Sequence, residues 1–159
     1  MRDPDFIASC HERVRDMYYY WDEKRAGRLM PRRGDLDPLE FHRLLPDVGL
    51  VDVVPDDRRY VYRLIGTNEA QMRGRDPTGL AVKDAYFGTS VDTVYLNYDK
   101  VVRDRCPVID RDPSRTSDDR YICHETIFLP LSDDGEKVNM VLFLTVYVTP
   151  YFALLPELG

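Results

Sequence analysis

The first clear pattern of apolar positions runs from Asp5 to about Ala26. Its apolar residues recur at spacings of three and four, which places them in one stripe along a helix. The pattern predicts an amphipathic helix that lies on an apolar surface, with Gly27 as a natural C-terminal stop. The stripe consists of Ile7, Cys10, Val14, Met17 and Trp21.

Three consecutive tyrosines, Tyr18 to Tyr20, widen the apolar surface of this helix beyond one stripe. Two partners are therefore open to it: its own sheet, which general helix burial favours, or another subunit. For the second alternative, the candidate interface with a partner or in a dimer consists of Val14, Met17, Tyr18 and Trp21.

Two β-rich runs follow, Val48 to Val54 and Tyr60 to Ile65, and the turn residues between them predict a hairpin. The segment before them, Lys24 to Pro38, reads as an irregular and locally basic connector. A short helix is expected from Leu39 to Leu45, because Pro46 ends it.

The second half of the chain predicts one longer helix and three strands. The apolar positions from Ser90 to Arg105 lie on one side of a helix. The sequence Asp133-Asp134-Gly135 is a strong turn signal between the last two strands, and the mixed-charge stretch Asp110 to Arg120 is expected to be a loop. The three strands are expected at Pro107–Asp110, Tyr121–Leu131 and Val138–Thr149.

These elements predict an α+β fold with one five-stranded antiparallel sheet. Short helices lie on one face, the N-terminal helix covers the other, and the very apolar last strand lies in the middle. The chain of 159 residues is long enough to bury a core of its own. The expected parts are the helix at 1–27, one domain at 28–149 and a C-terminal tail at 150–159.

Charge and composition narrow the function. A formal net charge of -6 disfavours a nucleic-acid binder, which needs a positive field. Three scattered cysteines fit reduced thiols in the cytoplasm, and the N-terminus lacks the pattern of a secretory signal. The uncharged run Met140 to Pro156 is too short and too interrupted for a membrane span, and its β-branched and aromatic residues favour a buried strand.

The stretch YRLIGTNEAQMRGRDPTG, Tyr62 to Gly79, resembles the signature of a PAS domain. In that signature the second strand ends in a small polar residue, a short helix follows, and a Gly-x-x-x-x-Gly turn, here Gly74 to Gly79, leads on. Together with PRRGDLDP, LLP and LPLSDDG, it is similar to a family of short, single-domain PAS-like proteins of alphaproteobacteria. The resemblance covers roughly Trp21 to Thr149.

The resemblance implies a non-enzymatic sensory or signalling domain with a small cavity between the short helices and the sheet. Such a domain binds a small molecule, a protein partner or both, and signals by docking or by forming a homodimer. The expected mechanism is a shift between two packings of the N-terminal helix on the sheet, which requires a ligand or partner with different affinity for the two states.

The cofactor is unknown, and two known PAS cofactor sites are not supported. Flavin photosensors carry a reactive cysteine just after the second strand, but the matching GTNEAQMRGR has none. Haem-binding members use a histidine near the longer helix, and Ser90 to Arg105 contains none.

The candidate ligand-binding residues combine an expected sheet or helix position with a group that can orient a small molecule. They are Arg63, Met72, Tyr95, Tyr98 and His124. No catalytic or metal set is recognisable, because His124 and Glu125 are neighbours on a strand and point to opposite faces. Two alternatives stay open: a small enzyme that uses His124 with an acidic residue, and a structural adaptor whose cavity is filled by its own side chains.

A cluster of basic residues stands out in this acidic chain. It can dock an acidic partner or a phosphate-bearing ligand, but the reading as a solvated connector is favoured, because most surface charges contribute little. The cluster consists of Lys24, Arg25, Arg28, Arg32 and Arg33.

Overall fold

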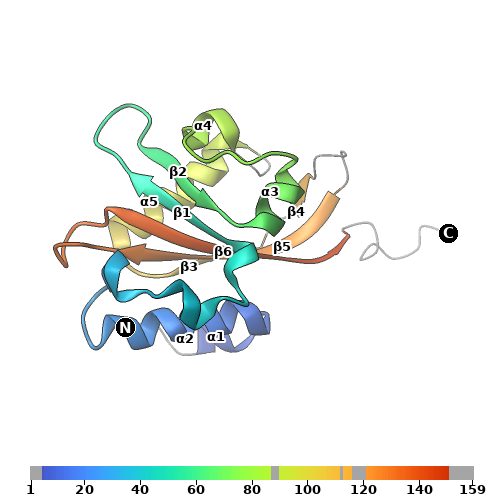
Figure 1. Cartoon of the computed structure of the whole chain (residues 1–159). Coiled ribbons are helices and arrows are strands. Elements are labelled where there is room, and N and C mark those ends of the chain that lie inside the picture. Colours follow the sequence, from blue (N-terminus) through green and yellow to red (C-terminus); the bar gives the residue numbers. More distant parts are fainter. Residues whose placement is uncertain (1–4, 87–89, 112, 116–120, 151–159) are drawn as a thin grey trace.

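The computed structural model describes residues 5–86, 90–111, 113–115 and 121–150. Within these residues, the strands form one antiparallel sheet with helices on both faces (Figure 1). The strand order is β2-β1-β6-β5-β3, so the very apolar last strand lies in the middle, as predicted. The strands are β1 (Val48–Val53), β2 (Tyr60–Ile65), β3 (Val108–Asp110), β4 (Pro113–Arg115), β5 (Tyr121–Leu131) and β6 (Met140–Pro150).

The two longest strands, β5 and β6, are neighbours inside the sheet and pair along nearly their whole length. Gly135, in the turn between them, has a φ of 81°, a value that glycine adopts without steric cost. The predicted turn at this place and the predicted β1–β2 hairpin are confirmed.

Strand β4 was not predicted, because it falls in the mixed-charge stretch that was expected to be a loop. Its backbone pairs with Tyr121, Ile122 and Cys123 at the start of β5. A strand at a sheet edge needs only free backbone groups on its neighbour, so it can form without the apolar alternation from which a strand is predicted. The rest of that stretch, residues 112 and 116–120, lies outside the described residues.

One face of the sheet carries α3 (Thr67–Arg73), α4 (Val82–Ala85) and α5 (Val91–Asp104). Helix α5 was predicted correctly, and its first turn is capped by Ser90, whose Oγ accepts from the Thr93 amide at 3.1 Å. Helix α3 ends at Gly74, which has a φ of 80°. The Gly74–Gly79 turn then returns to the edge of β2, where the Gly79 amide donates to the Tyr62 carbonyl at 2.7 Å.

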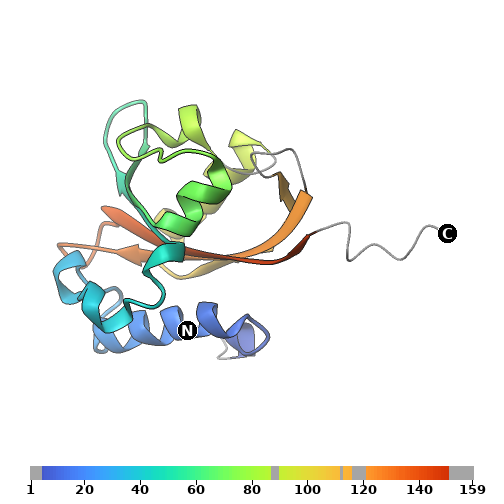
Figure 2. The same cartoon turned by 45° about the vertical axis from the view of Figure 1, so that its right-hand side comes forward.

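The other face is covered by α1 (Asp5–Ala8) and α2 (Glu12–Arg25), as predicted (Figure 2). The prediction of one continuous helix was wrong. The helix is interrupted before α2, because the His11 amide donates to Glu125 Oε1 on β5, at 2.6 Å, instead of to a helix carbonyl. The His11 ring then caps α2, since its Nδ1 accepts from the Arg13 amide at 3.1 Å.

The connector between α2 and β1 consists of three short 3-10 turns: η1 (Arg33–Asp35), η2 (Pro38–Phe41) and η3 (Leu45–Asp47). They replace the single short helix that was predicted, and Pro46 lies inside η3 rather than after a helix. Turn η3 lies so close to the start of α3 that a Cβ on Gly66 would be 2.3 Å from the Leu45 carbonyl oxygen.

A β-bulge in β2 rotates the end of that strand. Leu50 of β1 pairs with Leu64 and Val51 pairs with Tyr62, so Arg63 is the extra residue. Tyr62 therefore faces α3, whereas Leu64 lies with the η turns on the other side. No helix in the described part of the chain has the length and apolar character needed to cross a bilayer.

Candidate functional site

A buried ion pair lies between α3 and the sheet. Arg73 Nε and Glu69 Oε2 are 2.9 Å apart, one helical turn from each other on α3. The two side chains are only 9% and 1% exposed. Such a pair is stable only when hydrogen bonds satisfy the remaining polar atoms, so its other partners define the site.

Aromatic rings surround the guanidinium of Arg73. Its Nη1 donates to the Tyr62 hydroxyl at 2.9 Å, and its Cζ lies 4.8 Å from the centre of the Tyr62 ring and 5.8 Å from that of Phe143. The Phe143 ring in turn lies over Gly49, where a Cβ would approach it to 2.1 Å. Glycine at position 49 therefore makes the room that Phe143 occupies beneath Arg73.

Tyr147 of β6 completes the network, since its hydroxyl donates to Glu69 Oε1 at 2.7 Å. Burial, reinforced by the charge of Glu69, raises the pKa of Tyr147. Burial alone would lower the pKa of Arg73, but Tyr62 and Glu69 outweigh it and raise that pKa. Arg73 thus stays charged, and Tyr147 stays protonated at neutral pH. We call Tyr62, Glu69, Arg73 and Tyr147 the interior network.

An open hollow of about 580 Å³ adjoins this network. Tyr147 belongs to both, because it lines the hollow and bonds to the buried Glu69. The N-terminal segment, the η turns, α3 and β6 all contribute to its walls. These are His11, Arg13, Arg43, Pro46, Asp47, Asn68, Gln71, Met72, Val146 and Tyr147.

Asp47 joins three elements at the wall of this hollow. Its carboxylate forms an ion pair with Arg13 of α2 through Oδ2, and its Oδ1 accepts from Asn68 Nδ2 of α3 at 2.9 Å. Arg13 Nη2 also donates to the Arg43 carbonyl at 3.0 Å. The side chain of Asp47 is mostly buried, so these bonds tie α2 to the body of the domain where the hollow opens.

Three of the five predicted ligand-binding residues lie in or near this region. Met72 lines the hollow. The His124 ring is 6.4 Å from that of Tyr147, and its Nε2 lies 3.5 Å from Asp110 Oδ2. Tyr98 is buried deeper in the core, stacked on Tyr60 with ring centres 5.1 Å apart.

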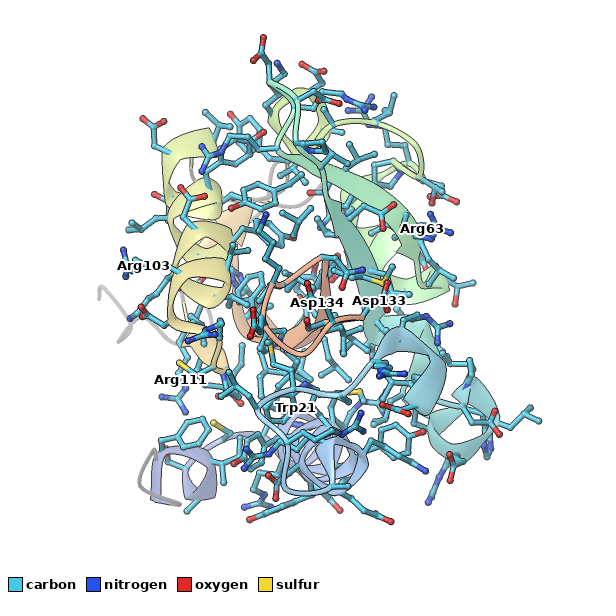
Figure 3. All side chains as sticks on the ribbon, turned by 90° about the vertical axis from the view of Figure 1, so that its left-hand side faces the viewer. Trp21, Arg63, Arg103, Arg111, Asp133 and Asp134 are labelled. Carbon is cyan, nitrogen blue, oxygen red and sulfur yellow. The ribbon has the colours of Figure 1, made fainter. Side chains whose placement is uncertain are left out.

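The other two predicted residues lie elsewhere. Arg63 is exposed at the outer edge of the sheet, where its Nη1 lies 3.2 Å from the carboxylate of Asp52 (Figure 3). The Tyr95 hydroxyl donates to the Arg58 carbonyl at 3.1 Å, beside the β1–β2 turn. The structure therefore does not bring the five predicted residues together.

Sequence reasoning missed the polar members of the interior network. Glu69 and Arg73 stand four apart, a spacing that signals an ion pair on a helix, but the same spacing is common on solvated helices. Tyr62 and Tyr147 each stand in an apolar strand, where nothing marks them as partners of buried charges.

The four residues predicted to form an interface are turned mainly toward the protein's own core. Val14, Met17 and Trp21 are buried against the sheet, and Trp21 Nε1 donates to the Pro130 carbonyl at 2.9 Å (Figure 3). Tyr18 is half-buried and packs edge-on to Phe6, with ring centres 5.3 Å apart. The side chains of Val14, Met17 and Trp21 become accessible to a partner only if α2 leaves the sheet, whereas Tyr18 is partly accessible as it lies.

The basic cluster is largely neutralised within the chain. Three of its members pair with acidic neighbours, which supports the reading as a solvated connector. The pairs are Lys24 with Glu40, Arg25 with Asp22, and Arg28 with Asp35.

Glu125 points to the face opposite His124, as predicted. Its Oε1 accepts from the His11 amide and its Oε2 pairs with Arg111 Nε at 2.8 Å. Among the described residues, no three histidine, cysteine, aspartate or glutamate side chains are grouped so that they can hold a metal ion.

Comparison with known proteins gives a consistent result. A family model described as "PAS domain" matches residues 9–145. One similar solved structure is a light-oxygen-voltage domain studied with a flavin analogue, with a TM-score of 0.56 and 11% identity over 72% of this chain and 86% of that chain. Another is the dark structure of the blue-light photoreceptor Aureochrome1 LOV, with a TM-score of 0.56 and 8% identity over 74% and 87%.

A PAS domain of a protein from Colwellia psychrerythraea is also similar, with a TM-score of 0.51 and 12% identity over 71% of this chain and 98% of that chain. At these identities the likeness shows the fold alone. A search of curated proteins found no match.

Proposed function

Because the chain belongs to the PAS domain family, whose members are generally sensory and non-enzymatic, we propose that it is a signalling domain that binds a small molecule, a protein partner or both. Its output is docking to a signalling protein or formation of a homodimer. Within the family, we place it among the short single-domain PAS-like proteins of alphaproteobacteria, on the segments that resemble them. We propose the cytoplasm as its location, because its cysteines are scattered and two of them, Cys10 and Cys106, are free.

One observation carries this proposal: the hollow has one wall on the N-terminal helix and the others on the PAS core. His11 and Arg13 come from the N-terminal segment, whereas Asn68 and Met72 come from α3. Any molecule that fills the hollow touches both parts. Its affinity therefore depends on where the helix lies, which is the condition for a ligand to shift a conformational equilibrium.

The moving part in this mechanism is the segment 1–27, and the sensing part is the domain 28–149. In one state α2 covers the sheet and its apolar residues are buried. In the other state α2 moves away, and Val14, Met17, Tyr18 and Trp21 become available to a partner. Met72 contacts the ligand directly, and His124 and Tyr98 support the ligand site through their packing near Tyr147 and β2.

Native mass spectrometry of the gently purified protein, combined with hydrogen exchange, tests this function. We expect the mass spectrum to show either a retained small molecule or a bound partner. When the bound species is changed, we expect faster amide hydrogen exchange in α2 than in α5. Equal exchange in α2 with and without every bound species would reject signalling through the helix.

A specific observation also favours the adaptor alternative, in which the domain binds only proteins. The interior network and Phe143 fill the region between α3 and the sheet with the chain's own side chains. Bare subunit masses in the spectrum, together with a stable protein partner, would identify an adaptor rather than a ligand sensor.

The flavin named for one solved neighbour is not carried over to this chain. The identity is 11%, and the segment from Thr67 to Gly79 has no cysteine for the photochemistry of that class. The enzyme alternative has the His124–Asp110 pair to support it, and neither of these two residues lines the hollow.

A further inference from the structure

Two arginines, Arg13 and Arg43, and a single carboxylate, Asp47, line the hollow between α2 and α3. We propose that it binds a small organic anion, with a carboxylate or phosphate held by Arg13 and Arg43 and a short apolar body on Met72 and Val146. This inference rests on the proposed function and names the class of its ligand.

Arg43 supplies the charge that attracts an anion. Its side chain is exposed on the wall of the hollow, and no carboxylate in the described part of the chain pairs with it. Its carbonyl accepts from Arg13 Nη2, so the backbone of one arginine is fixed beside the guanidinium of the other. Two guanidinium groups with one neighbouring carboxylate, Asp47, leave an excess of positive charge here.

His11 adds a further donor. Its Nδ1 accepts from the Arg13 amide, so the proton of the neutral ring must be on Nε2. The ring lines the hollow, and its Nε2–H is the hydrogen-bonding group that it has left for a ligand.

The carboxylate on the same walls is already engaged. Asp47 uses one oxygen for Arg13 and the other for Asn68. A cationic ligand would therefore find no uncommitted carboxylate, whereas an anion finds Arg43, His11 and the amide groups of Asn68 and Gln71.

The remaining walls suit a hydrocarbon body. Pro46, Met72 and Val146 contribute apolar surface between the polar groups. A volume of about 580 Å³ is in the usual range for small-molecule sites. An anion at Arg13 also competes with Asp47 for that guanidinium, so binding weakens one of the bonds that tie α2 to the core.

Calorimetric titration of the full chain tests the inference with three probes: hexanoate, its uncharged analogue hexanamide, and inorganic phosphate, all at the same ionic strength. We expect hexanoate or phosphate to bind and hexanamide not to bind. Arg43→Gln should weaken anion binding about tenfold or more, because a hydrogen bond to a charged group is lost. The matched control is Arg32→Gln, an exposed arginine outside the hollow, which should leave the Kd unchanged.

Each outcome decides the matter. Binding of hexanoate identifies a carboxylate ligand, and binding of phosphate alone identifies a phosphate ligand. Equal binding of hexanamide, an equal loss in the Arg32→Gln variant, or no binding by either anion at millimolar concentration would overturn the inference. A neutral molecule or a protein retained in native mass spectrometry would then leave the proposed function standing. Anion binding without any change in α2 exchange would reject the proposed mechanism but not the anion site.

Discussion

The stability of the domain interior depends on the buried ion pair of Glu69 and Arg73. Both charges are almost completely buried, and each carboxylate oxygen of Glu69 has its own donor, Arg73 or Tyr147. Burying two charges costs several kcal/mol per ion, and only this degree of pairing offsets that cost. The interior is therefore sensitive to the loss of any one member of the network.

We expect Glu69→Gln to lower the free energy of unfolding by about 3–5 kcal/mol, because it leaves the charge of Arg73 buried without a carboxylate. Urea denaturation measures the change. The double variant Glu69→Gln/Arg73→Met should recover a large part of the loss, and Glu12→Gln, at an exposed position, should change stability by less than about 0.5 kcal/mol. Simple additivity of the two single changes would show that the pair is not coupled.

Buried tyrosines set the alkaline limit of stability. Burial raises the pKa of Tyr62, Tyr98 and Tyr147 above the usual value of 10.0. The native state therefore keeps these protons at a pH where the unfolded chain releases them. Their contribution is complete below pH 10 and is lost as the pH rises above 10 toward the native values.

A spectrophotometric titration of tyrosinate, run beside a pH series of urea denaturation curves, checks this expectation. These tyrosines should ionise only as the fold is lost, and the unfolding midpoint should fall steadily above pH 10. Free ionisation of every tyrosine near pH 10 in a fully folded protein would contradict it. The Tyr147→Phe variant should reduce the slope of the decline.

The anchoring of α1 and α2 depends on one carboxylate. Glu125 accepts from the His11 amide at the break between the two helices and pairs with Arg111, whose Nη2 lies 3.0 Å from Cys10 Sγ. This small set of bonds fixes where the N-terminal segment turns. It explains why α1 and α2 are separate elements on the same face.

We expect Glu125→Gln to speed amide exchange in residues 6–17 several-fold and to leave α5 unchanged, because the amide keeps only one acceptor oxygen and its NH2 group cannot accept from the His11 amide or from Arg111. Hydrogen exchange read out by mass spectrometry gives both regions in one experiment. Glu23→Gln, on the exposed face of α2, is the control and should exchange like the unmodified protein. A uniform increase over all helices would indicate general destabilisation instead of a local anchor.

The same elements show what can be read from a sequence. Strands β1, β2, β5 and β6 and helix α5 were predicted nearly to their ends, because each buries a regular apolar pattern. The break at His11 and strand β4 were not, because a distant carboxylate and a neighbouring strand edge determine them. In the site, Met72 was identified, but Arg13, Arg43 and Asp47 were not, since only the fold brings these three segments to one hollow.

The domain depends on having both faces of its sheet covered. Along β5 and β6, Phe128 and Phe143 face the α5 side. Side chains alternate along a strand, so the residues directly before and after each phenylalanine face α2. Apart from Glu125, the described side chains of that second face are mainly apolar, and they are buried under the N-terminal segment. They include Ile127, Leu129, Leu142 and Leu144.

Deleting residues 1–20 would uncover this face, and we expect the shortened chain to self-associate or to lose its fold. An apolar surface of several side chains is unstable in water, and a second copy of the chain offers the same surface in return. Analytical ultracentrifugation across a range of concentrations measures association, and circular dichroism separates a folded dimer from an unfolded chain. A Met17→Ala variant of the full chain, which keeps the cover but loosens its packing, should lose about 2–5 kcal/mol of stability and should keep the oligomeric state of the unmodified chain. A monomeric shortened chain with unchanged stability would mean that α2 is not needed to cover the sheet, and the helix would then lose its place in the signalling mechanism.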